Sequence, residues 1–168
     1  MRLEFDRLSI LVAEDNAHMR RALVAMLEAF GATAILEAGD GEIALELFLE
    51  QKPDIALLDW EMPGLDGLAL ARRMRDRTAS PNPFIPILMV TAYAEKGRVV
   101  AARDAGVSDF VAKPVTAKIL YDKILGLVLE QRPFVATKDY FGPDRRRSDP
   151  PLYRGPERRK SRHREDGR

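Results

Sequence analysis

Cysteine is absent from this sequence of 168 residues, which excludes a disulfide framework, a thiolate metal site and a cysteine nucleophile. No apolar run is long enough to cross a bilayer, so we expect no membrane insertion. Acidic residues, Glu4 and Asp6, stand where a secretory leader would have its apolar stretch. Since 46% of the residues are hydrophobic, the chain has enough apolar material for a core. These features favour a cytoplasmic globular protein.

Charge is unevenly distributed along the chain, although the formal net charge is only +1. Residues 133–168 carry 11 Lys and Arg against 6 Asp and Glu, whereas the other 132 residues carry 16 against 20. The same segment holds 5 of the 11 prolines and has no helical apolar period. We therefore predict a folded domain over residues 1–131 and a basic tail over residues 132–168, which is disordered until it binds an anionic ligand.

Apolar segments of strand type alternate with segments of helical period in the first 131 residues. The predicted strands cover residues 8–13, 33–37, 54–58, 87–90 and 109–112. The predicted helices cover residues 19–30, 41–52, 65–77, 95–105 and 116–130. This alternation predicts a doubly wound α/β fold, in which helices cover both faces of a parallel sheet and ligands bind at the carboxyl ends of the strands.

Reactive side chains follow four of the predicted strands. Glu14 and Asp15 follow the first strand, Asp59 the third, Thr91 the fourth and Lys113 the fifth. Three carboxylates at one place repel each other unless a cation joins them, and oxygen ligands suit Mg²⁺ or Mn²⁺. A cation beside a lysine would neutralise an incoming phosphoryl group, and a carboxylate between them could attack it and form an acyl phosphate.

These motifs resemble the receiver domains of two-component response regulators, the CheY-like family. The matching segments are Glu14-Asp15, residues 59–67 (DWEMPGLDG), Thr91-Ala92 and Lys113-Pro114. The resemblance covers roughly residues 6–131 and implies a (βα)5 domain whose five-stranded parallel sheet has the order 2-1-3-4-5. It also implies a histidine kinase or phosphotransfer protein as partner. The expected chemistry is self-phosphorylation and autodephosphorylation at most, so the protein is not interpreted as an enzyme.

The resemblance assigns a role to each strand-end residue. Asp59 is the phospho-acceptor, and Thr91 and Lys113 bind the phosphoryl group, with a cis bond expected before Pro114. The expected metal ligands are Glu14, Asp15, Asp59 and the backbone carbonyl of Glu61. Phe110 occupies the aromatic switch position, where a core aromatic that does not switch is the alternative. For Trp60 we expect packing or a partner surface rather than catalysis.

The tail contains an internal repeat with a period of 13 residues. Residues 140–146 (YFGPDRR) recur as residues 153–159 (YRGPERR). Arginine can form a bidentate pair with the O6 and N7 edge of guanine, while tyrosine or a guanidinium plane stacks on its face. A carboxylate can accept protons from the other edge of the base, and further arginines pair with phosphate. Two such units in tandem suit a ligand with two guanines and two phosphates, such as cyclic di-GMP.

The tail also resembles the arginine-rich segment of the Cle proteins, a CheY-like subfamily that binds cyclic di-GMP. That resemblance implies an effector that binds a protein partner at the flagellar motor or cell pole and controls motility or surface attachment. The expected ligand-binding residues are Tyr140, Asp144, Arg145, Arg146, Tyr153, Arg154, Glu157, Arg158 and Arg159.

Two alternatives to this effector function stay open. In one, phosphorylation of Asp59 controls the protein and the basic tail is incidental. In the other, the tail is a tether for nucleic acid or for an acidic membrane surface, which predicts a steep salt dependence and little nucleotide selectivity. No familiar DNA-binding domain follows the receiver-like segment, because the tail is short and lacks helical apolar periodicity.

Overall fold

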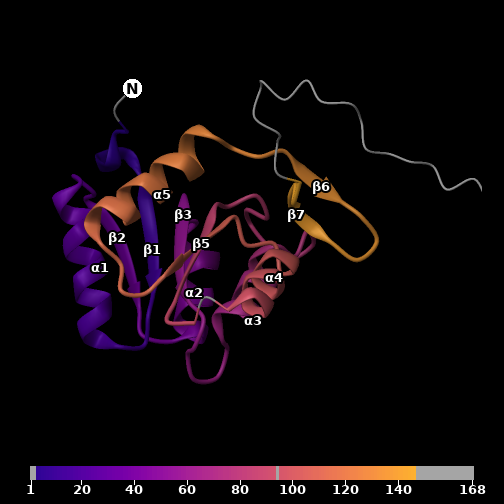
Figure 1. Ribbon diagram of the computed structural model, residues 1–168, viewed down its shortest axis with the longest axis horizontal. Helices are drawn as coiled ribbons and strands as arrows, with labels where there is room; N and C mark the ends of the chain where they lie inside the picture. The colour runs from indigo at the N-terminus through magenta and orange to yellow at the C-terminus, as the bar shows by residue number, and fades with distance from the viewer. Residues whose placement is uncertain (1–2, 94, 147–168) are drawn as a thin grey trace, which may run out of the picture.

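A five-stranded parallel sheet forms the centre of the protein (Figure 1). The computed structural model describes residues 3–93 and 95–146. The strands are β1 (Ser9–Ala13), β2 (Ala34–Ala38), β3 (Ile55–Asp59), β4 (Ile87–Thr91) and β5 (Asp109–Ala112). They lie in the order β2-β1-β3-β4-β5, and every neighbouring pair is parallel. The predicted α/β fold and its strand order are confirmed, with strand ends that differ from the prediction by one residue at most.

Four α-helices connect these strands and a fifth follows β5, and together they cover both faces of the sheet. They are α1 (Ala17–Ala29), α2 (Gly41–Gln51), α3 (Gly67–Met74), α4 (Lys96–Asp104) and α5 (Ala117–Leu129), preceded by a 3-10 turn at Phe5–Arg7. In the part of the chain that the structure describes, no helix has the length and apolar character needed to span a membrane.

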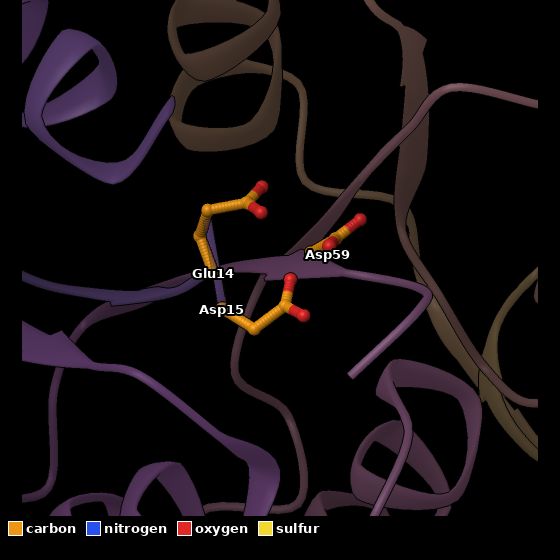
Figure 2. A group of neighbouring side chains, drawn as sticks. All are labelled: Glu14, Asp15 and Asp59. Carbon is orange, nitrogen blue, oxygen red and sulfur yellow. The ribbon is translucent and has the colours of Figure 1, made fainter. Parts of the chain in front are cut away.

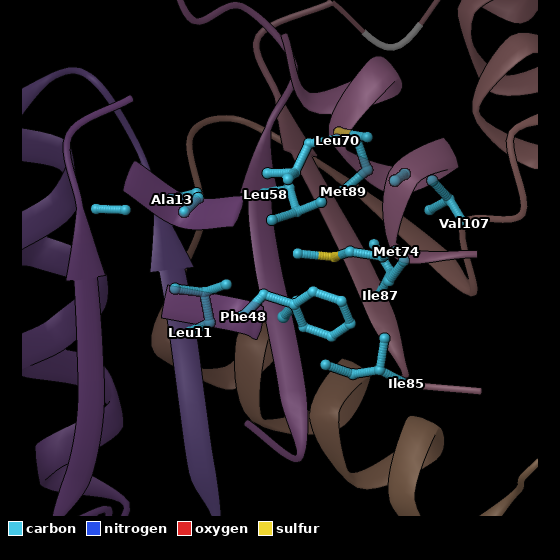
Figure 3. Packing of buried hydrophobic residues seen from close by; sticks show 14 of the residues in the cluster. Leu11, Ala13, Phe48, Leu58, Leu70, Met74, Ile85, Ile87, Met89 and Val107 are labelled. Carbon is cyan, nitrogen blue, oxygen red and sulfur yellow. The ribbon is translucent and has the colours of Figure 1, made fainter. Parts of the chain in front are cut away.

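The two faces of the sheet bury separate apolar clusters. One cluster joins the sheet to α2, α3 and α4 through residues such as Phe48, Met74 and Ala102 (Figure 3). The other joins it to α1 and α5 through residues such as Leu27 and Ile124. Side chains alternate between the two clusters along each strand, since a strand has a side-chain period of two. The apolar runs that predicted these strands are continuous because both faces are covered.

Four helices begin with a side chain that accepts a hydrogen bond from a backbone N–H of the first turn. Asn16, Asp40, Asp66 and Thr116 accept from the amides three residues later, at 2.8–3.3 Å. Such a cap stabilises a helix by about 1 kcal/mol. The capping residues differ from the strand-end carboxylates at positions 14, 15 and 59, so capping does not account for these carboxylates.

A two-stranded antiparallel hairpin follows α5 and corrects our expectation of an unstructured tail for its first residues. It consists of β6 (Phe134–Ala136) and β7 (Phe141–Pro143), and Thr137 donates to the carbonyl of Tyr140 at 2.8 Å. Strands of three residues are too short to display an alternating pattern, so no local pattern predicts them. The hairpin is stabilised by contacts with residues distant in sequence, which local patterns do not reveal.

Candidate functional site

Three carboxylates converge at the carboxyl edge of the sheet. Glu14 and Asp15 follow β1, and Asp59 ends β3 (Figure 2). One oxygen atom of each lies within 4.8 Å of the others. Glu14 and Asp59 are buried, with exposed fractions of 1% and 6%, whereas Asp15 is exposed. The structure therefore brings together the carboxylates that the sequence predicted to meet.

Lys113 supplies the positive charge of this cluster from the loop after β5. Its Nζ lies 2.8 Å from Oε2 of Glu14 and 3.3 Å from Oδ1 of Asp59. Its backbone N–H donates to the carbonyl of Thr91 at 2.8 Å, which ties this loop to the end of β4. The peptide bond between Lys113 and Pro114 is cis, as predicted.

The cluster changes the proton affinity of its members. Burial and, to a smaller extent, the neighbouring charge of Glu14 raise the pKa of Asp59 to about 7, although Lys113 opposes both effects. Burial alone would lower the pKa of Lys113, but its hydrogen bond with Glu14 and the charge of Asp59 raise the pKa overall. One lysine thus does not balance three carboxylates, and their charge favours the binding of another cation.

The donor set fits Mg²⁺, a hard cation that prefers carboxylate and carbonyl oxygens and keeps several waters. Glu14, Asp15 and Asp59 offer oxygens at one place, and the carbonyl of Glu61 stays a predicted fourth ligand. A groove of about 480 Å³ opens beside them, lined by Asp15, Trp60, Glu61, Met62, Pro63 and Asp66. Of the three carboxylates, Asp15 is the one that lines this groove.

A glycine holds the loop after β3 close to the acceptor. A Cβ atom at Gly67 would collide with the backbone carbonyl of Asp59. The N–H of Gly67 instead donates to the carbonyl of Trp60 at 2.9 Å. This close approach fixes the start of α3 against the end of β3, so the loop of residues 60–66 has a defined path along the groove.

Thr91 and Phe110 lie where the receiver resemblance requires them. Thr91 ends β4 and is buried, and its Oγ1 accepts a hydrogen bond from the N–H of Tyr93 at 3.2 Å. Phe110, in β5, is partly buried and packs against the apolar cluster beneath α3 and α4. Their roles as phosphoryl ligand and aromatic switch stay predictions.

Sequence patterns did not reveal Arg98, which bridges two loops beside the groove. Its guanidinium lies 5.0 Å from the ring centroid of Trp60 and 4.8 Å from that of Tyr93. These partners are distant in sequence, so no local pattern connects them. The only signal is a cation in the first turn of a helix, a position that the helix dipole disfavours.

The first copy of the tail repeat folds onto the receiver at the opposite edge of the sheet. Tyr140 is buried and its hydroxyl donates to the carbonyl of Pro143 at 2.8 Å. The guanidinium of Arg145 stacks 3.7 Å from the Tyr140 ring centroid and pairs with Asp104 at 2.6 Å. The structure therefore uses two of the predicted ligand-binding side chains for internal contacts.

Two of the remaining predicted ligand-binding residues, Asp144 and Arg146, belong to the first copy of the repeat, and the others belong to the second copy. Oδ1 of Asp144 accepts a hydrogen bond from the N–H of Arg146 at 3.0 Å, and Arg146 is exposed. The second copy of the repeat falls outside the described residues; its predicted members are Tyr153, Arg154, Glu157, Arg158 and Arg159.

The hairpin docks over a buried arginine, Arg75, another residue that the sequence patterns missed. Its side chain donates to the carbonyls of Gly106, Pro83 and Ile85 and to the hydroxyl of Ser108, at 2.6–3.3 Å. Burial lowers the pKa of Arg75 to about 9, so this side chain remains charged at neutral pH. Its guanidinium also lies 5.0 Å from the ring centroid of Phe134 in β6.

Aromatic side chains complete the contact between the hairpin and the receiver. Phe84, Phe134 and Phe141 form a cluster with centroid distances of 5.0–5.5 Å. At Gly142, a Cβ atom would crowd Gly106, so glycine allows the two backbones to approach. The hairpin is thus a packed addition at the amino ends of β4 and β5.

Comparisons with known proteins agree with this geometry. The family model described as "Response regulator receiver domain" matches residues 10–125. Chemotaxis protein CheY of Pseudomonas aeruginosa is 38% identical over 117 residues, which cover 70% of this chain and 93% of that protein. Transcriptional regulatory protein CseB of Streptomyces coelicolor is 39% identical over 119 residues, covering 71% of this chain and 48% of that protein.

Solved structures extend the comparison to the backbone. The signal receiver domain of NarL from Mycobacterium tuberculosis aligns with a TM-score of 0.67 and 31% identity over 74% of this chain and 98% of that domain. The Francisella response regulator 1452 receiver domain aligns with a TM-score of 0.63 and 26% identity, covering 71% and 96%. The hairpin follows the residues that the family model matches. From residue 10 to residue 125, this chain belongs to the CheY-like response regulator receiver domains, a family of signalling modules rather than enzymes.

Proposed function

We propose that the protein is a two-component response regulator controlled by phosphorylation of Asp59. The observation that carries this proposal is the position of Asp59, buried at the end of β3 between two carboxylates and the ammonium group of Lys113. Burial of an aspartate beside other carboxylates costs stability, so a structural role does not explain it. The charged groups around Asp59 are already placed to stabilise a phosphoryl group that its carboxylate attacks. The family membership supports a histidine kinase or phosphotransfer protein as its donor.

The residues present can carry out the transfer in one displacement. An Oδ atom of Asp59 attacks the phosphorus of the donor, the bond from phosphorus to the leaving atom breaks, and its electrons leave with that atom. Lys113 is within reach to stabilise the phosphoryl oxygens, since its Nζ already contacts Asp59 at 3.3 Å. Mg²⁺ held by Glu14, Asp15 and Asp59 would neutralise negative charge on the transferring group. In hydrolysis, water attacks phosphorus and restores the Asp59 carboxylate and inorganic phosphate.

The signal is proposed to leave the site through Thr91 and Phe110. Thr91 ends the strand beside β3, and its hydroxyl now accepts from the N–H of Tyr93 at 3.2 Å. A phosphoryl oxygen on Asp59 offers that hydroxyl a charged acceptor, which forms a stronger hydrogen bond than a neutral one. Movement of Thr91 would free space beside β5, into which Phe110 turns, and so change the surface formed by α4, β5 and α5.

Incubation with acetyl phosphate and Mg²⁺ tests this function. Intact-mass spectrometry should find one added phosphoryl group on the wild-type chain, and chelation of Mg²⁺ should prevent the reaction. The matched control is Asp59→Asn, which keeps the shape of the side chain and removes the nucleophile. Equal phosphorylation of the Asn variant, or none of the wild type with either acetyl phosphate or phosphoramidate, would overturn the proposal.

A second candidate function is supported by the tail repeat. We propose that the tail binds cyclic di-GMP through the two Tyr-x-Gly-Pro-acid-Arg-Arg units and thereby controls a cytoplasmic partner, the flagellar motor switch. The repeat supports this because a generic basic arm needs neither the aromatic nor the acid that both copies contain. In the first copy, Arg145 would have to leave Tyr140 and Asp104 before it could bind guanine.

Isothermal titration of cyclic di-GMP tests the second function. The full chain is compared with a chain that ends at Arg146, which keeps the docked hairpin, and with the variant Arg145→Ala, Arg158→Ala. GTP and cyclic di-AMP are the control ligands. Selective binding that both changes weaken supports the effector function. Absent binding, or equal binding of all three nucleotides, would contradict it and leave phosphorylation as the input.

A further inference from the structure

Arg98 is enclosed by two loops that leave neighbouring strands of the sheet. Trp60 belongs to the loop after β3 and Tyr93 to the loop after β4. The guanidinium of Arg98 is 5.0 Å from the first ring centroid and 4.8 Å from the second, within the range of cation–π attraction. One side chain from the first turn of α4 therefore joins both loops.

The hydrogen bonding of Arg98 adds a third partner. Its Nη2 donates to Oε1 of Glu61 at 3.1 Å. Its Nη1 is buried and has no hydrogen-bond partner among the described residues, which costs free energy. A cation at this position is also opposed by the dipole of α4. Local helix stability therefore does not explain an arginine here, whereas its contacts with Trp60, Tyr93 and Glu61 do.

The contacts of Arg98 lie on the loop that directly follows the acceptor. Trp60 directly follows Asp59, and Trp60 and Glu61 both line the groove of about 480 Å³ beside the carboxylates. Arg98 contacts both of these lining side chains. Arg98 can therefore affect the wall of the groove through Trp60 and Glu61, and it need not contact the carboxylates.

We propose that Arg98 is a positioning residue that holds Trp60 and Glu61 in the wall of this groove and so limits the access of phosphodonor and water to Asp59. The proposal rests on the phosphorylation of Asp59 proposed above. It places one control over both reactions of the acceptor, because the small donor and the hydrolytic water enter by the same opening. Loss of Arg98 should therefore accelerate both reactions, rather than impair them as loss of a catalytic residue would.

The test compares Arg98→Ala with the wild-type chain. With acetyl phosphate and Mg²⁺, the rates of phosphorylation and of subsequent dephosphorylation should both rise about three- to tenfold, the effect expected when two stacking contacts and one exposed ion pair are lost. Arg98→Lys keeps the charge, but an ammonium group cannot stack on the rings and pair with Glu61 at once. Its rates should therefore lie between those of the wild type and of Arg98→Ala. Arg103→Ala, an exposed change of the same charge on the same helix, is the control and should leave both rates unaltered.

Fluorescence provides a readout that does not depend on phosphorylation. Trp60 is the only tryptophan of the chain, so its emission reports this ring alone. Acrylamide should quench the emission about twofold more strongly in Arg98→Ala than in the wild type or in Arg103→Ala, since one face of the ring becomes accessible. Unchanged quenching, or rates that fall or stay within 1.5-fold of the wild type, would overturn the role of Arg98. If the wild type is not phosphorylated at all, the proposed function fails, and the quenching comparison still decides whether Arg98 positions Trp60.

Discussion

Buried charge has different partners at the two edges of the central sheet, which are formed by the carboxyl ends and the amino ends of its strands. At the carboxyl edge, Glu14 and Asp59 both pair with Lys113 beside a third carboxylate, Asp15, and the pKa of Asp59 rises to about 7 because burial disfavours its negative form. At the amino edge, Arg75 is equally buried, yet its guanidinium donates to three carbonyls and one hydroxyl. One edge leaves charge unbalanced, whereas the other satisfies it with neutral acceptors.

This difference separates a reactive site from a structural one. Unbalanced carboxylates favour a cation and an electrophile, so the free energy that they cost is recovered only when those groups bind. The guanidinium of Arg75 already makes four hydrogen bonds, and it joins the end of α3 to the segments before β4 and β5 and to the docked hairpin. Substitutions at the two edges should therefore affect stability with opposite signs.

The largest effect on stability is expected at Arg75. Arg75→Ala leaves three buried carbonyls without this donor and removes the support beneath Phe134, so we expect a loss of about 3 kcal/mol in the free energy of unfolding. Urea denaturation followed by circular dichroism measures it. Arg77→Ala is the matched control, because Arg77 is exposed and has one stacking contact, with Phe141. Arg77→Ala should lower the free energy of unfolding by less than about 1 kcal/mol. Equal losses for the two variants would contradict the structural role of Arg75.

The next effect concerns Asp59 and its dependence on pH. Since the folded pKa is about 7 and the ordinary value is 3.8, the folded state binds more protons than the unfolded state between these values. The free energy of unfolding of the metal-free protein should therefore fall as pH rises from about 4 to 7, by about 2 kcal/mol once relaxation of the pocket is allowed for. This contribution becomes constant only about one pH unit above the folded pKa, where the folded carboxyl is almost fully ionised.

Asp59→Asn removes the titrating group and should abolish this part of the pH dependence. The variant should be more stable than the wild type at pH 7.5 and about equal to it at pH 4. Chemical denaturation at a series of pH values in the presence of a chelator measures both curves. Addition of Mg²⁺ should flatten the wild-type curve, because a bound cation favours the charged carboxylates. Parallel curves for the wild type and the variant would show that the carboxyl edge is not unbalanced in the way described.

The smallest effect is expected at Arg145. Arg145→Ala removes the stack on Tyr140 and an exposed pair with Asp104, so the global free energy of unfolding should change by less than about 1 kcal/mol. Local opening of the hairpin should nevertheless increase. Hydrogen exchange of the amides in β6 and β7 should accelerate about threefold relative to Arg146→Ala, whose side chain is exposed. Equal exchange rates in the two variants would show that Arg145 does not stabilise the docked hairpin.

The same contrast explains what the sequence could and could not predict. Glu14, Asp59, Thr91 and Lys113 follow strands that are visible as apolar runs, and parallel strands bring their carboxyl ends together, so the site could be assembled from the chain alone. Arg75 and Arg98 act through partners far away in sequence that obey no period. The hairpin was missed for a similar reason, since its strands have three residues each and depend on Phe84 and Arg75 for their packing.

Identification of the residue that becomes phosphorylated tests whether Asp59 is the acceptor. The chain is treated with acetyl phosphate and Mg²⁺, the acyl phosphate is reduced with borohydride, and peptides are sequenced by tandem mass spectrometry. Reduction converts a phosphorylated aspartate to homoserine and leaves free carboxylates unchanged. We predict homoserine at position 59 and at no other position. Modification of Asp15 instead, or of a carboxylate outside this cluster, would contradict the conclusion that the carboxyl edge is built around Asp59.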